Sequence, residues 1–129
     1  MKPCVVYKKF VMFGDLNPIK VLYGGTMLKW IDEAASIFAA EQLGKGKHFS
    51  TIKVSEILFK HPARLGDLLT FSAQFNRVGR TSFGVSVFVC NREREIVSCD
   101  VTFVALDDEG RPIRHGLPPL EGDSLHTSP

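Results

Sequence analysis

Hydrophobic residues recur at spacings of three and four across residues 26–43, the period of an α-helix with one apolar face. Gly24-Gly25 precede this segment, and Gly44 and Gly46 follow it, as glycines often do at the ends of a helix. The sequence therefore predicts one long helix, and the alanines on its apolar face allow another surface to approach closely. The apolar positions are Met27, Ile31, Ala34, Ala35, Phe38 and Ala39.

The segments after this helix mix apolar and polar residues in the manner of β-strands. We expect strands at residues 49–59, 68–78, 81–90 and 96–106, and a first strand before the helix within residues 5–13. The charged residues 91–95 are typical of an exposed hairpin tip. One strand, one helix and then four strands in a meander make an α+β arrangement.

The end of the chain has a different composition. From Asp107 onward glycines, prolines and polar residues dominate. We therefore expect a single domain over residues 1–129, with its core at about residues 5–106 and a loosely held tail at residues 107–129.

Composition narrows the choice of partners and compartment. The chain is 44% hydrophobic and 23% charged with a net charge of +2, which is ordinary for a globular protein and predicts no nucleic-acid partner. No segment approaches the roughly 20 apolar residues that span a membrane, and residues 1–15 lack the apolar core of a signal peptide. An odd number of cysteines suits a reducing compartment, so we expect a cytoplasmic protein without a membrane partner.

The histidines give no sign of a metal site. They have no recognised ligand spacing, so we expect neither a metal nor another cofactor. The four are His48, His61, His115 and His126.

Residues 14–35 carry the densest group of candidate functional residues. Asp15 and Asn17 precede Gly24-Gly25, and Asp32 follows Gly25 by seven positions. Two further blocks, residues 59–67 and 78–82, stand at the starts of later strands. Together these motifs resemble the signature of hotdog-fold acyl-CoA hydrolases, and the similarity covers about residues 5–106.

The resemblance implies a hotdog fold, in which an antiparallel sheet of about five strands wraps around one long helix. It also implies hydrolysis of acyl-CoA to a free acid and CoA, with Asp32 as general base or nucleophile and Asn17 orienting water. The Gly24-Gly25 helix start would supply the oxyanion-hole N–H, with Gly25 the better candidate, because a helix N-terminus offers unpaired N–H groups and partial positive charge.

The spacing of these residues bears on assembly. Asp32 lies about 10 Å along the helix axis from Gly25, too far to serve the same carbonyl easily within one subunit. In the family that the chain resembles, the active site is shared across a dimer. We therefore expect self-association as a dimer or a higher oligomer, such as a tetramer or hexamer, with acyl-CoA as the other partner.

Some positions have two interpretations. Arg80, Thr81 and Ser82 suit the phosphates of CoA, since Arg forks onto phosphate and hydroxyls add donors, but they suit a plain strand start equally well. Asn17 before Pro18 can equally be only a turn. The sequence also departs from the family pattern, with Lys20 where a glycine is usual.

Three alternatives to acyl-CoA hydrolysis remain open. The first is an acyl-CoA-binding or regulatory hotdog module without chemistry, and the second is a thioesterase that acts on acyl-carrier protein. The third is a hotdog hydratase, which typically carries a paired Asp and His near the helix start. The chain has no histidine before Gly46, which disfavours the third.

Overall fold

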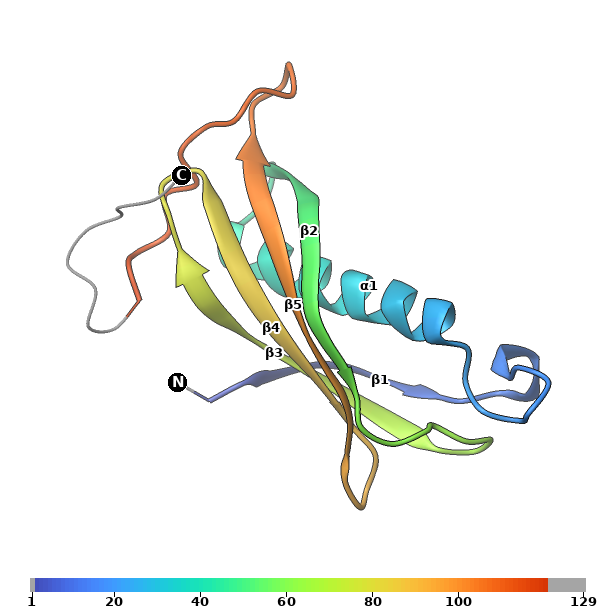
Figure 1. Ribbon diagram of the computed structural model, residues 1–129. Coiled ribbons are helices and arrows are strands. Elements are labelled where there is room, and N and C mark those ends of the chain that lie inside the picture. Colours follow the sequence, from blue (N-terminus) through green and yellow to red (C-terminus); the bar gives the residue numbers. More distant parts are fainter. Residues whose placement is uncertain (1, 121–129) are drawn as a thin grey trace.

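The computed structural model describes residues 2–120 and contains one antiparallel sheet with a long helix across one face (Figure 1). This confirms the predicted α+β hotdog architecture. The elements in chain order are β1 (Cys4–Phe10), the 3₁₀ turn η1 (Phe13–Asp15), α1 (Gly24–Leu43), β2 (His48–Phe59), β3 (Leu68–Val78), β4 (Ser82–Cys90) and β5 (Glu95–Leu106).

The order of strands in the sheet is β1-β3-β4-β5-β2. Strands β3, β4 and β5 form a meander, but β2 pairs with β5 rather than with β3. The prediction of a four-stranded meander is therefore wrong for β2, which does not pair with the strand that follows it. Strand β1 occupies the free side of β3, so β2 must take the far edge, where it pairs from His48 to Phe59.

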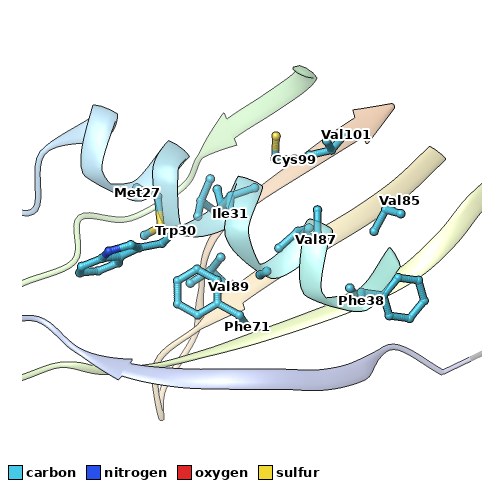
Figure 2. Close-up of a cluster of buried hydrophobic side chains, with 14 of the residues drawn as sticks. Met27, Trp30, Ile31, Phe38, Phe71, Val85, Val87, Val89, Cys99 and Val101 are labelled. Atoms are coloured by element: carbon cyan, nitrogen blue, oxygen red, sulfur yellow. The ribbon is translucent and has the colours of Figure 1, made fainter. Parts of the chain in front are cut away.

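The apolar face of α1 packs on the inward-facing residues of the central strands (Figure 2). Ala34, Ala35 and Ala39 are completely buried, so the helix backbone lies close to the sheet. On β4 the predicted alternation holds, because the side chains that face α1 are fully buried. These β4 residues are Phe83, Val85, Val87 and Val89.

The segment after β5 packs on the domain in place of the loose tail expected there. Ile113 N–H donates to Ala105 O at 3.0 Å, and His115 N–H donates to Arg80 O at 3.3 Å. The side chains of His115 and Leu117 are buried. The rest of the expected tail, residues 121–129 with His126, lies outside the described residues.

Strand β2 is an irregular edge. Within residues 2–120 it pairs only with β5, and that pairing is interrupted between Thr51 and Lys53 and again between Ser55 and Leu58. Glu56, at the second irregularity, has a positive φ of 51°. Large apolar side chains remain exposed along this edge, namely Ile52, Val54, Leu58 and Phe59.

Candidate functional site

The start of α1 presents unpaired backbone donors. The helix begins at Gly24, two residues before the predicted position, and the N-cap residue Tyr23 makes no side-chain capping bond. The first N–H groups of a helix have no partner within it, and the helix dipole adds partial positive charge there. A carbonyl oxygen that gains negative charge can therefore bind at this end.

Nothing inside the described chain requires glycine at position 25. Its φ is not positive, and a Cβ built on it meets no atom within 4 Å. A Cβ at Gly24 would make only an ordinary 3.7 Å contact with Cζ of Phe59. The bare backbone therefore matters only for a group that approaches from outside the chain, such as a ligand or a partner subunit.

Asn17 shapes the loop that leads into the helix. Its side-chain Oδ1 accepts hydrogen bonds from the N–H groups of Ile19 at 3.0 Å and Val21 at 3.2 Å. Its Nδ2 makes no hydrogen bond within residues 2–120, so this donor is available to a water or a substrate. Lys20 adopts a left-handed φ of 67° and so takes the conformation that glycine adopts most easily.

Asp32 is half-buried near the middle of α1, and its carboxylate contacts β2. Thr51 Oγ donates a hydrogen bond of 2.8 Å to Asp32 Oδ1. The Asp32 carboxylate also lies near Cys99, since burial first, then the charges of Asp100 and Asp32, raise the pKa of that thiol to about 11. Thr51 was missed in the sequence because only the crossing of α1 over β2 brings it to Asp32.

One chain alone does not bring the predicted catalytic groups together. Asp32 lies over the Thr51 end of β2, whereas the Gly24 turn lies over the Phe59 end of the same strand. Along the helix axis Asp32 and Gly25 are separated by about 10 Å. The carboxylate and the helix N-terminus of one subunit therefore face different positions along the edge strand.

The predicted phosphate-binding residues Arg80, Thr81 and Ser82 are far from the helix start. Ser82 pairs with Val104 near one end of β5, whereas Phe59, which lies beside Gly24, pairs with Val97 near the other end. The Ser82 side chain is buried, and its Oγ accepts a hydrogen bond of 2.7 Å from Arg77 Nη2. The Arg80 side chain is exposed and Thr81 is half-buried. Of the three, Arg80 is the most accessible to a phosphate.

The part of the chain that the structure describes contains neither a cluster of metal ligands nor a membrane-spanning helix. Among residues 2–120 no three or more His, Cys, Asp and Glu side chains gather as a metal site would require. No helix in this range has the length and apolar character needed to cross a membrane.

An antiparallel sheet wrapped on one helix defines a hotdog-fold protein, and here the helix carries a half-buried carboxylate and begins at an uncapped glycine turn. The chain belongs to the thioesterase superfamily, whose sequence profile matches residues 19–98.

Among curated proteins, the chain is 37% identical to Protein VdlD of Helicobacter pylori, over 71% of this chain and 55% of that protein. It thus spans about half the length of that relative. It is 31% identical to a Zymomonas mobilis protein named as an uncharacterized acyl-CoA thioester hydrolase, over 81% of this chain and 71% of that one.

Solved structures agree with the fold. A hexameric hotdog-fold thioesterase of Campylobacter jejuni matches with a TM-score of 0.76 and 28% identity, over 85% of this chain and 88% of that one. An acyl-CoA hydrolase of Staphylococcus aureus, solved with butyryl coenzyme A and coenzyme A, matches with a TM-score of 0.81 and 29% identity, over 91% and 72%. Variants of that hydrolase with one threonine or one aspartate replaced by alanine have also been solved.

Proposed function

We propose that the chain hydrolyses acyl-CoA thioesters to a free carboxylic acid and CoA, as a homodimer or a larger assembly of dimers. The observation that carries this proposal is the placement of two groups along β2. The Asp32 carboxylate is held by Thr51 at one end, and the uncapped Gly24-Gly25 turn lies at the other. The names of the Zymomonas and Staphylococcus relatives support acyl-CoA as the substrate.

Pairing of two β2 strands would complete the site. In an antiparallel pair centred on Ser55, Thr51 of one subunit faces Phe59 of the other, because residue numbers in such a pair have a constant sum. Asp32 of one subunit would then approach the glycine turn of its partner. This contact would also cover the exposed apolar residues of the edge and satisfy its unpaired backbone groups.

Each group then has a defined role. The Gly25 N–H and the helix dipole bind the thioester oxygen as it gains negative charge. Asp32 of the partner removes a proton from water as the water oxygen attacks the carbonyl carbon. The free Nδ2 of Asn17 donates to that water. When the C–S bond breaks, the proton passes from Asp32 to the departing CoA thiolate.

Direct attack by the Asp32 carboxylate is the other route to the same products. It forms a mixed anhydride with the acyl group, which water then hydrolyses. A single turnover in ¹⁸O-labelled water identifies the anhydride if label appears in the Asp32 carboxylate, detected by peptide mass analysis. Label confined to the released acid arises in both routes, because water can also attack the acyl carbon of the anhydride. Hydroxylamine added during turnover then separates them, since only an anhydride converts Asp32 to a hydroxamate.

The test is a panel of acyl-CoAs from short to long, with free thiol release as the readout. We expect Asp32→Asn to lower kcat by about a hundredfold or more, the scale of losing a positioned base. Glu33→Gln is the matched control, because Glu33 is the adjacent carboxylate, exposed on α1, and its activity should match the parent. Absence of thiol release from every acyl-CoA would contradict the proposal and favour an acyl-carrier protein substrate or a binding role.

A second experiment tests the shared site. Two chains, one with Asp32→Asn and one with Gly25→Val, are co-expressed with different tags and purified as a mixed dimer. A mixed dimer has one of its two sites intact, so we expect about half of the parent activity from two nearly inactive chains. Persistent inactivity of a folded mixed dimer would contradict a site shared across subunits.

A cytoplasmic location remains part of the proposal and agrees with the free thiols of Cys4, Cys90 and Cys99.

A further inference from the structure

A cavity of about 350 Å³ opens beside the first turn of α1. Gly24 lies in its wall, and most of the remaining surface comes from apolar side chains. Its deepest members are at most 8% exposed, so the cavity reaches the edge of the hydrophobic core. The apolar lining consists of Val21, Leu22, Met27, Phe59, Ala63 and Ile96.

Apart from the helix start at Gly24, several backbone groups around this cavity already have partners. Leu22 N–H donates to Ala63 O at 2.9 Å, and the N–H groups of Lys60 and His61 both donate to Ile96 O, at 2.8 and 3.2 Å. Val21 N–H donates to Asn17 Oδ1. A ligand segment with amide or hydroxyl groups would therefore bury polar atoms here without these donors, which is unfavourable.

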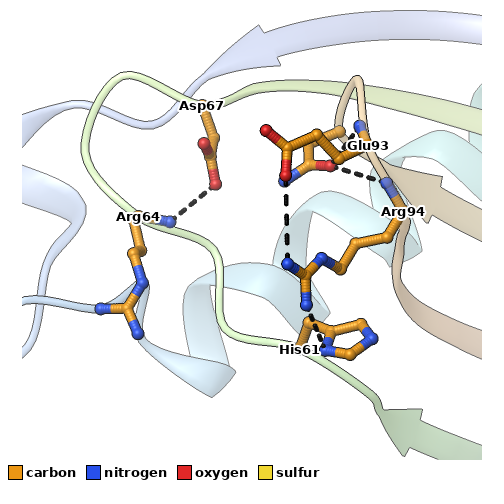
Figure 3. A network of polar contacts seen from close by, with 6 residues as sticks. His61, Arg64, Asp67, Glu93 and Arg94 are labelled. Carbon is orange, nitrogen blue, oxygen red and sulfur yellow. Dashed lines mark hydrogen bonds and ion pairs between the residues drawn. The ribbon is translucent and has the colours of Figure 1, made fainter.

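The two charged or polar side chains of the lining are also engaged. Lys60 Nζ lies 2.6 Å from Glu95 Oε2. His61 Nδ1 accepts a hydrogen bond of 3.1 Å from Arg94 Nη1, because a guanidinium can only donate (Figure 3). The cavity thus offers an apolar surface whose polar rim is paired with neighbours.

We propose that this cavity holds the acyl chain of the thioester, an inference that rests on the proposed function. If the carbonyl oxygen binds at the Gly25 N–H, the carbon chain of the acyl group begins beside Gly24, at the cavity wall. The polar pantetheine arm of CoA then leaves in another direction. An apolar cavity of about 150 Å³ accepts the six carbons of a benzene ring, so a cavity of about 350 Å³ suits a chain of roughly ten to fourteen carbons.

The experiment measures the dependence of kcat/KM on chain length, from acetyl-CoA to palmitoyl-CoA. We expect the parent to prefer medium chains, since each buried methylene improves binding by about fourfold. Ala63→Leu fills the inner wall and should lower kcat/KM for decanoyl-CoA by at least tenfold, with less than a twofold change for acetyl-CoA.

Two further variants guard against a folding defect. Val21→Phe narrows the cavity from a half-buried position and should shift the preference to shorter chains, as Ala63→Leu does. Val5→Phe places the same substitution at an exposed site on β1 and should keep the parent profile. If folded Ala63→Leu and Val21→Phe both keep the parent profile, the cavity is not the acyl site, although the proposed hydrolase function stands.

Binding of a non-hydrolysable thioether analogue of decanoyl-CoA, measured by calorimetry, separates this inference from the proposed function. The parent protein supports the cavity assignment if it binds the decanoyl analogue at least tenfold more tightly than the acetyl analogue and if Ala63→Leu or Val21→Phe abolishes this difference. If the same parent releases no thiol from any acyl-CoA, the hydrolase function is contradicted while the cavity assignment stands. Equal affinities for both analogues, in parent and variants, overturn the acyl-chain assignment.

Discussion

The hydroxyl of Thr51 donates a hydrogen bond of 2.8 Å to Oδ1 of Asp32 and so joins the edge strand β2 to α1. This bond fixes one oxygen of the carboxylate and leaves the other for water or substrate. Because Asp32 is half-buried and has no ion pair within residues 2–120, Thr51 is the side chain that orients it.

Replacement of Thr51 tests this positioning role. Thr51→Val keeps the shape of the side chain but removes the donor. A hydrogen bond to a charged group contributes about 1.5–3 kcal/mol, so kcat should fall by about ten- to a hundredfold. KM should stay within about twofold, since the substrate contacts are unchanged. Thr51→Ser should recover most of the rate, and a serine variant as slow as the valine variant would rule out the hydroxyl.

Gly25→Ala separates function from stability. A Cβ at this position meets no atom within 4 Å, and alanine favours the helix, so unfolding free energy should stay equal or rise by up to about 1 kcal/mol. Thioester hydrolysis should nevertheless fall at least tenfold, because the methyl group blocks the approach of the carbonyl to the N–H. Gly14→Ala, also in open space, is the control in both assays. Full activity in Gly25→Ala would remove the helix start from the site.

Lys20 should resist β-branched replacement. Its left-handed φ of 67° is unfavourable for a branched side chain, so Lys20→Val should lower the unfolding free energy by about 1 kcal/mol or more. Lys20→Gly should stay within about 0.5 kcal/mol of the parent. In the Lys20→Gly variant, relief of backbone strain stabilises the folded state. Two effects oppose it, namely the greater freedom of the unfolded chain and the loss of the contact between Lys20 and the Phe13 ring. Urea unfolding at one fixed protein concentration measures both, and equal stability of the two variants would contradict a strained Lys20.

Alkaline pH should weaken the fold through Cys99. Burial, then Asp100 and Asp32, raise the pKa of this thiol from 9.0 to about 11. The folded state therefore holds the thiol proton more tightly than the unfolded state, and the resulting stability is complete below pH 9 and is lost as pH rises to 11. Between these values the unfolding free energy of the parent should fall about 2–3 kcal/mol more than that of Cys99→Ala. Parallel pH curves for the two proteins would contradict the shift.

Local sequence patterns predicted most of the secondary structure but not the full pairing. Strand β3 has the predicted ends because Gly66-Asp67 and Gly79 flank its apolar run, and β4 shows the expected alternation. The position of β2 at the far edge of the sheet was not predicted. Its partner β5 is distant in the sequence, and the local sequence pattern of β2 does not indicate which strand it pairs with. The contact between Thr51 and Asp32 depends on that choice and was missed with it.

The segment after β5 was misjudged for a related reason. Its glycines and prolines lower local propensity for regular structure, but two backbone hydrogen bonds and the buried side chains of His115 and Leu117 hold it against the sheet. Such contacts come from tertiary structure, which composition does not describe. The candidate catalytic residues, in contrast, were proposed from motif spacing, and their roles remain predictions for the experiments above.

The irregularities of β2 also affect which other chains can join this sheet. An exposed edge strand is open to any flat β-strand, and that openness leads to aggregation. Here the two breaks in register and the left-handed Glu56 distort the row of free N–H and C=O groups, so a regular foreign strand cannot pair along its length. In the proposed pairing of two β2 strands, the second copy brings irregularities of its own. The irregular edge would then favour self-association over pairing with a regular foreign strand.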